Sequence, residues 1–275
     1  MPEGHTLLRL ATDLRAAFAG EAVRVSSPQG RFTDSAALVD GHVIEGADSA
    51  GKHLFIHFAN DFVVHVHLGL IGAFIMRPAP TLPAVGAVRL RIEGSTAYAD
   101  LRGATVCELV TEPMVAQIVA KLGPDPLRPD ADAERAFARI RKSMKPIGAL
   151  LMDQTVLSGV GNVFRAETLF RARLHPLTPG ERVTKRRWNL MWADLVELMA
   201  YGVATGRIDT VRPEHEAIAM GREPRVDNHG GEVYVYRRTG QPCYVCGSRV
   251  RTQVLEGRNL FWCPTCQRLR NSPRL

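Results

Sequence analysis

Apolar positions along the chain first recur at helical spacing and then alternate with polar ones. In residues 4–19 one face carries Leu7, Leu10, Leu14 and Phe18, and Gly20 follows, so we predict an amphipathic helix. From about residue 21 to residue 110 the pattern is that of short strands. The predicted strands are residues 54–58 and 62–67, which form a hairpin around Ala59-Asn60-Asp61, and residues 88–92 and 105–110.

After residue 112 the apolar spacing becomes helical again. Helices are predicted over residues 114–122, 133–143, 147–153, 163–171 and 181–205. Residues 206–231 are rich in Arg, Glu, Pro and Gly and predict a loop, whereas residues 232–238 predict a further strand.

Four of the five cysteines form two close pairs near the end of the chain. Cys243 and Cys246 are followed, after 16 residues, by Cys263 and Cys266. This spacing is typical of a tetrahedral thiolate zinc site, because each pair supplies two sulfurs and the intervening segment is long enough for a hairpin. Disulfides are rare in a reducing compartment, and a redox motif would be a single pair. We predict one structural zinc ion, and we interpret Cys107 as a core residue.

Together these patterns predict an α+β multidomain fold. Residues 1–112 would form a β-rich N-terminal domain that begins with a helix, residues 113–231 a helical domain, and residues 232–275 a zinc-finger hairpin.

Composition narrows the class of protein. Of the 275 residues, 45% are apolar and 23% charged, which excludes disordered and collagen-like chains. The most apolar stretch, residues 62–76, is 15 residues long and contains two histidines, whereas a membrane-spanning helix needs about 20 apolar residues. The N-terminus has no signal-peptide pattern, so we expect a cytoplasmic protein. The net charge of +7, and six Arg against one acid in residues 241–275, suit nucleic acid as a partner.

Three apparent motifs predict no chemistry. Gly46 to His53 nearly matches a phosphate-binding loop, but His53 stands where that loop needs Ser or Thr, and a strand pattern follows. Residues 159–162 lack the third glycine of a dinucleotide fingerprint, so no nucleotide cofactor is predicted. His65 and His67 share a strand face, but a histidine pair without a third ligand is more often structural.

The N-terminus offers a nucleophile. Removal of Met1 before the small Pro2 would leave a secondary amine, and an α-amino pKa near about 8 leaves part of it unprotonated at neutral pH. Amines form Schiff bases with electrophilic carbons, and the adjacent Glu3 can donate or accept the protons. The alternative is that Glu3 only favours the first helical turn through its dipole.

Several motifs accompany this N-terminus in a fixed order. They are Met1-Pro2-Glu3-Gly4, Gly51-Lys52 before a strand, Asp153-Gln154 with Gly159-Val160-Gly161-Asn162-Val163-Phe164-Arg165-Ala166-Glu167, and Gly257-Arg258 with Phe261-Trp262-Cys263-Pro264 in the cysteine region. Over its whole length the chain resembles the formamidopyrimidine-DNA glycosylase / endonuclease VIII family of base-excision repair enzymes.

The resemblance implies a bifunctional DNA glycosylase and AP lyase that acts on damaged DNA. We expect a monomer by default. The resemblance also implies an N-terminal helix plus an antiparallel β-sandwich in residues 1–112 and a helix–two-turns–helix DNA-binding element in residues 113–231. It implies that Pro2 forms an imine with the sugar, that Glu3 and Lys52 assist as catalytic residues, and that β,δ-elimination cuts the strand. The DNA-binding residues that it implies are Leu70, which would enter the vacated space, and Arg102, Asn162, Arg165 and Arg258.

Details favour the endonuclease VIII branch of the family. Asn60-Asp61 and the Asn162 to Arg165 spacing are similar to that branch, Ala104 replaces the aromatic wedge of the other branch, and residues 222–232 are short for a lesion-capping loop. These features favour oxidised pyrimidines in duplex, bubble or single-stranded DNA. Two alternatives stay open: a formamidopyrimidine/8-oxoguanine glycosylase, and a lesion-binding paralogue without catalysis.

Overall fold

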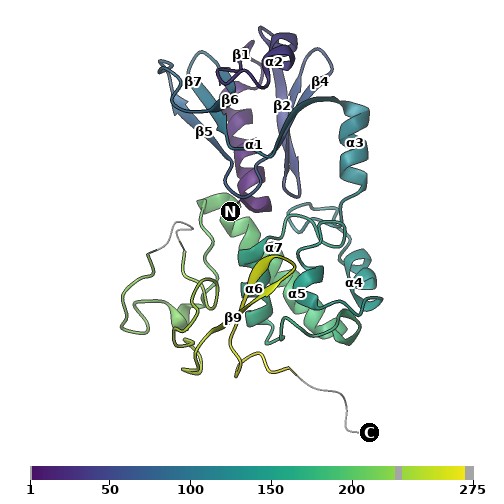
Figure 1. Ribbon diagram of the computed structural model, residues 1–275, viewed down its shortest axis with the longest axis vertical. Helices are drawn as coiled ribbons and strands as arrows, with labels where there is room; N and C mark the ends of the chain where they lie inside the picture. The colour runs from purple at the N-terminus through teal and green to yellow at the C-terminus, as the bar shows by residue number, and fades with distance from the viewer. Residues whose placement is uncertain (1, 227–230, 270–275) are drawn as a thin grey trace. The chain divides into compact units, whose positions relative to one another are not determined.

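The computed structural model describes residues 2–226 and 231–269 (Figure 1). The chain forms two compact units, residues 1–122 and residues 123–275. Our expectations for Met1, for residues 227–230 of the predicted loop, and for Arg270 and Arg274 fall outside the described residues.

The first unit contains two antiparallel four-stranded sheets. One has the order β1 (Arg24–Ser26), β6 (Val88–Glu93), β7 (Ala97–Arg102), β5 (Ala73–Pro78), and the other β2 (Ile44–Ala50), β3 (His53–Phe58), β4 (Phe62–His67), β8 (Val106–Thr111). Leu90 and Leu101 of the first sheet share one core with Ile56 and Val64 of the second. The predicted antiparallel sandwich is therefore confirmed.

Helices cover this sandwich where the apolar pattern requires it. In α1 (Gly4–Phe18), Leu7, Leu14 and Phe18 are buried in the shared core, as their spacing predicts. The short α2 (Thr33–Val39) adds Ala36 and Val39. On the outer face of the second sheet, α3 (Glu112–Ala120) packs against a smaller apolar cluster.

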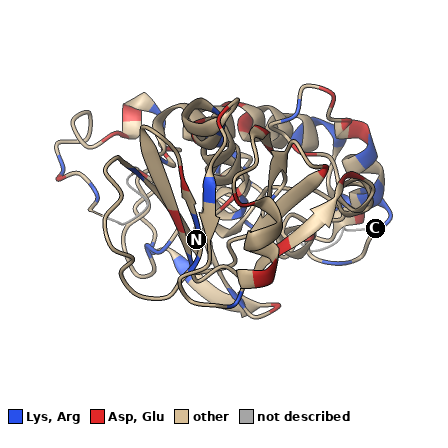
Figure 2. Ribbon diagram, turned by 90° about the horizontal axis from the view of Figure 1, so that it is seen from above, with Lys and Arg blue, Asp and Glu red and all other residues tan. Residues whose placement is uncertain are grey.

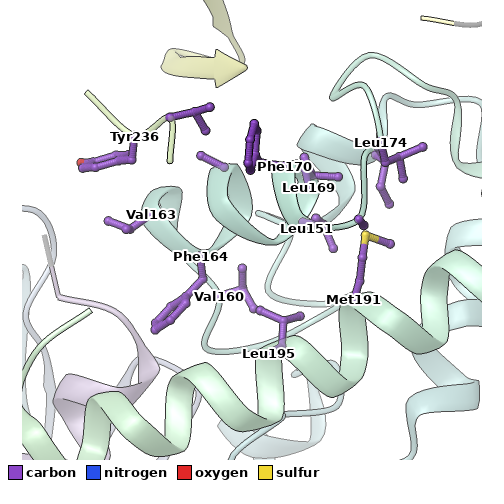
Figure 3. Close-up of a cluster of buried hydrophobic side chains, with 14 of the residues drawn as sticks. Leu151, Val160, Val163, Phe164, Leu169, Phe170, Leu174, Met191, Leu195 and Tyr236 are labelled. Atoms are coloured by element: carbon purple, nitrogen blue, oxygen red, sulfur yellow. The ribbon is translucent and has the colours of Figure 1, made fainter. Parts of the chain in front are cut away.

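Helices and one hairpin make up the second unit. The helices are α4 (Ala133–Arg141), α5 (Ile147–Leu150), α6 (Asn162–Arg171), α7 (Lys185–Thr205) and the short 3-10 turns η1 (Gly180–Arg182) and η2 (Pro213–His215), and the hairpin is β9 (Arg251–Leu255) with β10 (Arg258–Trp262). Residues 162–170 of α6 are all buried. In Figure 3, Phe164 of α6 points toward α7, which contributes Leu195, whereas Tyr236 lies on the other side of α6.

The prediction of a strand over residues 232–238 is wrong. These residues form turns, and their backbone N–H groups find a side-chain acceptor instead of a neighbouring strand. The N–H groups of Tyr234, Val235 and Tyr236 donate to the carboxylate of Glu167 at 2.6, 2.9 and 2.8 Å. Thr210 Oγ1 donates to the same carboxylate at 2.7 Å. The apolar side chains whose pattern predicted a strand are buried, but they pack in the same core as helix α6.

Within the described part of the chain, no helix combines the length and the apolar composition that crossing a bilayer would require.

Replacing Glu167 with Gln should destabilise the second unit by about 2–4 kcal/mol, because the amide would turn N–H donors toward backbone donors in a buried site. Thermal or urea unfolding measures this loss. Glu197→Gln on the exposed side of α7 is the control and should stay within about 0.5 kcal/mol. Equal unfolding midpoints for the two variants would contradict the importance of this carboxylate.

Candidate functional site

The N-terminal residues lie at the start of α1. Pro2 is half-buried, and Glu3, the residue that precedes the helix, is 0% exposed. A buried carboxylate beside the chain terminus is unusual for a residue that serves only the helix dipole, because a dipole contact needs no burial. The amine end and an enclosed carboxylate are thus brought together.

Lys52 occupies a two-residue loop between β2 and β3, in which Ala50 pairs with His53. Gly51 has a φ of 58°, which a glycine adopts without strain at the first position of such a loop. The rejected phosphate-loop motif is therefore a hairpin turn. Its glycine is required by backbone geometry.

Helix α1 and strand β2 run in opposite directions, which places Lys52 near the start of α1. Ala19 bridges to Ile44, and Arg15 donates to the carbonyl of Ala47 at 3.5 Å. From Arg15 the helix start is about 16 Å away, and from Ala47 the Lys52 loop is about 13 Å away in the same direction. Pro2, Glu3 and Lys52 consequently lie at the same end of the first unit.

Leu70 lies in the turn between β4 and β5, and it is 57% exposed. The neighbouring Ile71 is 86% exposed, so the turn presents two adjacent apolar side chains. The turn is held tightly, because a Cβ on Gly69 would come within 2.4 Å of Thr105. Sequence reasoning missed Ile71, although the Gly69-Leu70-Ile71-Gly72 pattern, with two apolar residues between glycines, is a usable signal.

Arg102 is anchored by Asp100 at the end of β7. Its Nη2 donates to Asp100 Oδ2 at 3.1 Å, and its side chain is 30% exposed. Asp100 also accepts two bonds from Arg91, at 2.7 and 2.9 Å. Although burial opposes it, hydrogen bonding and charge from Arg91 and Arg102 lower the pKa of Asp100 below its ordinary value. Ala104 is 7% exposed and packs in the core.

The start of α6 is joined to the start of β10 by buried polar side chains. Asn162 Nδ2 and Arg165 Nη2 both donate to the carbonyl of Asn259, each at 3.1 Å. Arg165 also donates to Asn162 Oδ1 and, at 3.2 Å, to the carbonyl of Gly148. Arg258 directly precedes Asn259, so this network brings Arg258 to the N-terminus of α6.

Arg165 itself is 1% exposed. A guanidinium enclosed in this way offers almost no surface to DNA, and its bonds instead orient Asn162 and β10. The structure favours a positioning role over the direct DNA contact that the resemblance implies.

The loop before α6 is closed by Gln154. Its side-chain amide donates to the carbonyl of Val160 at 3.1 Å and its oxygen accepts from Gly159 N–H at 3.0 Å. Gly159 has a φ of 82°, which favours glycine at this turn. The Gln154 and Gly159 motifs therefore shape the entry to α6.

Four cysteines converge next to the β9–β10 hairpin. The Sγ atoms of Cys243, Cys246, Cys263 and Cys266 all lie within 4.8 Å of one another. Tetrahedral Zn–S bonds of about 2.3 Å require sulfur separations near about 3.8 Å, and the separations Cys243–Cys266 and Cys246–Cys263 are 3.9 and 3.4 Å. The four residues fit one structural zinc ion, because their thiolates would occupy all four positions of its tetrahedron and leave none for a reacting water.

The cysteine site is tied to the helical core. Gln267, which is 0% exposed, accepts from Cys263 N–H at 2.9 Å and donates to the carbonyl of Leu174 at 2.9 Å. Cys107 lies apart from this site, and burial raises the pKa of its thiol to about 12. It is half-buried against the sandwich core, as the sequence predicts.

Charged residues of both signs occur throughout the ribbon (Figure 2). The net charge therefore does not locate a nucleic-acid surface by itself. The hydrogen bonds between the start of α6 and β10 are a more specific indication of such a surface than the net charge.

Purified protein should contain one zinc ion per chain, and Cys246→Ser should lose it. Without the metal the small β9–β10 hairpin has little core of its own, so Arg258 should lose its position and DNA affinity should fall. Metal analysis and a DNA-binding titration measure both effects. Cys107→Ser is the control and should keep the zinc; zinc-free protein with full DNA affinity would overturn the assignment.

Comparison with known protein families divides the chain into three matched segments. Residues 1–107 match the formamidopyrimidine-DNA glycosylase N-terminal domain, and residues 122–213 match the formamidopyrimidine-DNA glycosylase H2TH domain. Residues 240–269 match a zinc finger found in FPG and IleRS.

Individual relatives agree with these segments. Endonuclease 8 1 of Mycobacterium tuberculosis is 53% identical over 274 residues, which cover 97% of this chain and 100% of that protein. The formamidopyrimidine-DNA glycosylase of Thermus thermophilus is 31% identical and covers 97% of each chain. A solved complex between the Lactococcus lactis Fpg and an abasic site containing DNA has the same fold, with a TM-score of 0.80, 23% identity, and coverage of 97% and 100%. The chain therefore belongs to the formamidopyrimidine-DNA glycosylase / endonuclease VIII family of DNA repair enzymes, whose members are DNA glycosylases with AP lyase activity, and it is an endonuclease 8 homologue.

Proposed function

We propose that this protein excises oxidised pyrimidines from DNA through an imine at Pro2 and then cuts the strand by β,δ-elimination. The observation that carries the proposal is the placement of Pro2, buried Glu3 and Lys52 at one end of the first unit. We also propose the functional division 1–112 for catalysis, 113–231 for the helix–two-turns–helix, and 232–275 for the finger.

The chemistry follows from the three side chains. The Pro2 nitrogen attacks C1′ of the target nucleotide, the bond to the base breaks, and the nitrogen loses its proton. Cleavage of the C1′–O4′ bond then opens the sugar ring, with the proton taken up by O4′, and gives a cationic imine. Glu3 is buried, so its carboxyl group can exchange a proton with the sugar ring oxygen away from bulk water. Lys52 supplies a proton to the departing base. The imine acidifies C2′–H, and loss of that proton starts the elimination.

The same proposal assigns DNA phosphates to the start of α6. Backbone N–H groups at a helix N-terminus attract phosphate, and Arg258 adds a formal positive charge beside them. Asn162 and Arg165 hold the helix N-terminus beside Arg258, because both donate to the carbonyl of Asn259. Such contacts position DNA without reading its sequence, so the lesion is recognised elsewhere.

Lesion recognition would depend on extrusion of the base. The exposed Leu70 and Ile71 are suited to fill the space that a flipped nucleotide leaves, because both are apolar and reach into solvent. Arg102, fixed by Asp100, would contact the DNA beside them. Ala104 offers no wedge against the opposite base, so lesions that flip at low cost should be preferred.

Covalent trapping tests the nucleophile. Borohydride should trap the protein on abasic DNA, whereas a chain that retains an extra residue before Pro2 should not be trapped, because its Pro2 nitrogen is then an amide. The retained-residue chain should still bind DNA with an affinity within about threefold of the free-amine protein. Undiminished trapping of that chain would refute the Pro2 assignment.

A parallel cleavage assay tests the substrate. 5-Hydroxyuracil and thymine glycol should be excised faster than 8-oxoguanine paired with cytosine, with monomeric protein active on duplex, bubble and single-stranded oligonucleotides. Fastest cleavage of 8-oxoguanine would replace the proposal with a formamidopyrimidine-type activity. Tight lesion binding without cleavage would indicate a non-catalytic paralogue.

A further inference from the structure

Three side chains form a hydrogen-bonded chain across neighbouring strands on the outer face of the second sheet. His53 Nδ1 lies 2.8 Å from His65 Nε2, and His65 Nδ1 lies 2.9 Å from Glu108 Oε1. The residues come from β3, β4 and β8, which are adjacent in the sheet. One end of this series of hydrogen bonds is His53, which directly follows Lys52 in the sequence.

The carboxylate end determines where the protons lie. An ionised Glu108 can only accept, so His65 donates from Nδ1 and, when neutral, accepts at Nε2. His53 must then donate from Nδ1. The link between the two rings exists only while one of them is neutral, because two imidazolium rings would both be donors.

The three hydrogen-bonded side chains lead from an exposed carboxylate to a buried ring. The side chain of Glu108 is 54% exposed and that of His65 is 5% exposed. The rings of His53 and His65 stack with centroids 5.1 Å apart, and Phe55 stacks on His65 at the same distance. These contacts hold the His53 ring, and with it the first residue of β3 after the Lys52 loop.

We propose that Glu108, His65 and His53 are positioning residues that fix the Lys52 loop, and that protonation of the His53–His65 link releases it. The inference rests on the proposed catalytic role of Lys52. It gives the reaction a dependence on pH that does not require titration of Lys52 itself.

The surroundings of His53 support the sign of this dependence. Burial lowers the pKa of His53 to about 4, and the positive charges of His65, His67 and Lys52 act in the same direction. Burial also lowers the pKa of His67. A free imidazole has a pKa of about 6.5. The hydrogen bond between the rings therefore makes its full contribution to stability above that pH, and this contribution is lost as the pH falls toward 4. Other titratable groups on this face are Asp48, His57, Glu108 and Glu112.

The same face contains a matched pair for comparison. His57 Nδ1 lies 2.6 Å from Glu112 Oε1, and the Glu112 side chain is 57% exposed, much like Glu108. His57 is four residues further along β3 than His53, so this pair lies away from the Lys52 loop.

The decisive experiment compares Glu108→Gln with Glu112→Gln in single-turnover excision of 5-hydroxyuracil from pH 3.5 to 8, a range that includes the lowered pKa of His53. Glu108→Gln should move the acid limb to lower pH, because loss of the carboxylate makes the link harder to protonate. Glu112→Gln should keep the wild-type profile. Superimposable profiles of all three proteins would overturn the inference, although the wild type would still excise the base and the proposed function would stand.

A second pair of variants separates positioning from simple packing. His65→Phe should lower the excision rate by about 10- to 100-fold with DNA affinity unchanged, since misplacement of a catalytic group by about 1 Å has such effects. His65→Gln can accept from His53 and donate to Glu108, so it should restore most of the rate. Equal rates for the two variants would contradict the role of the hydrogen bonds.

A measurement without substrate completes the test. Imidazole NMR titration of DNA-free protein should show a depressed pKa for His53 that rises in Lys52→Met, because one neighbouring positive charge is removed. An ordinary His53 titration, unaffected by Lys52→Met, would refute the coupling whether or not the protein proves to be a glycosylase.

Discussion

The buried carboxylate of Glu167 is the interaction on which the second unit depends. It accepts three backbone N–H groups of residues 234–236 and the hydroxyl of Thr210. Without it, an irregular segment packed against α6 would leave buried donors unsatisfied, at a cost of about 1–3 kcal/mol each. A single carboxylate thus takes the place of a neighbouring strand, and it fixes the segment that leads from the helices to the cysteine hairpin.

The N-terminus of α6 is also held in place by buried polar contacts. Asn162 and Arg165 meet at the carbonyl of Asn259, so the helix N-terminus and Arg258 are placed by contacts that are themselves buried. The phosphate site that we propose there would gain from such support, because exposed arginines lose conformational entropy when they are ordered only by the ligand. A zinc ion would contribute as well, since one cysteine pair precedes and the other follows the hairpin that contains Arg258.

The first unit follows the same principle with different groups. Antiparallel packing of α1 on β2 brings the chain terminus and the Lys52 loop to one end, and the histidine chain across β3, β4 and β8 borders that loop. The groups to which we assign the chemistry therefore lie at the ends of regular elements. The support that we propose for the Lys52 loop consists of hydrogen bonds within the sheet, and such a support responds to protonation in a way that a purely apolar one would not.

Local patterns in the sequence determined α1, the β3–β4 hairpin, α6, α7 and the zinc site, because helical spacing, alternation and cysteine pairs are properties of a few consecutive residues. Local patterns did not group Pro2, Glu3 and Lys52; only the resemblance to the family did. Tertiary structure alone decided that residues 232–238 bind a carboxylate instead of forming a strand, that Arg165 is enclosed, and that His53 and His65 are linked to Glu108. Each of these depends on a partner between 12 and 94 positions away in the sequence. Burial and hydrogen-bond satisfaction are settled by such distant partners, and no local period in the sequence records them.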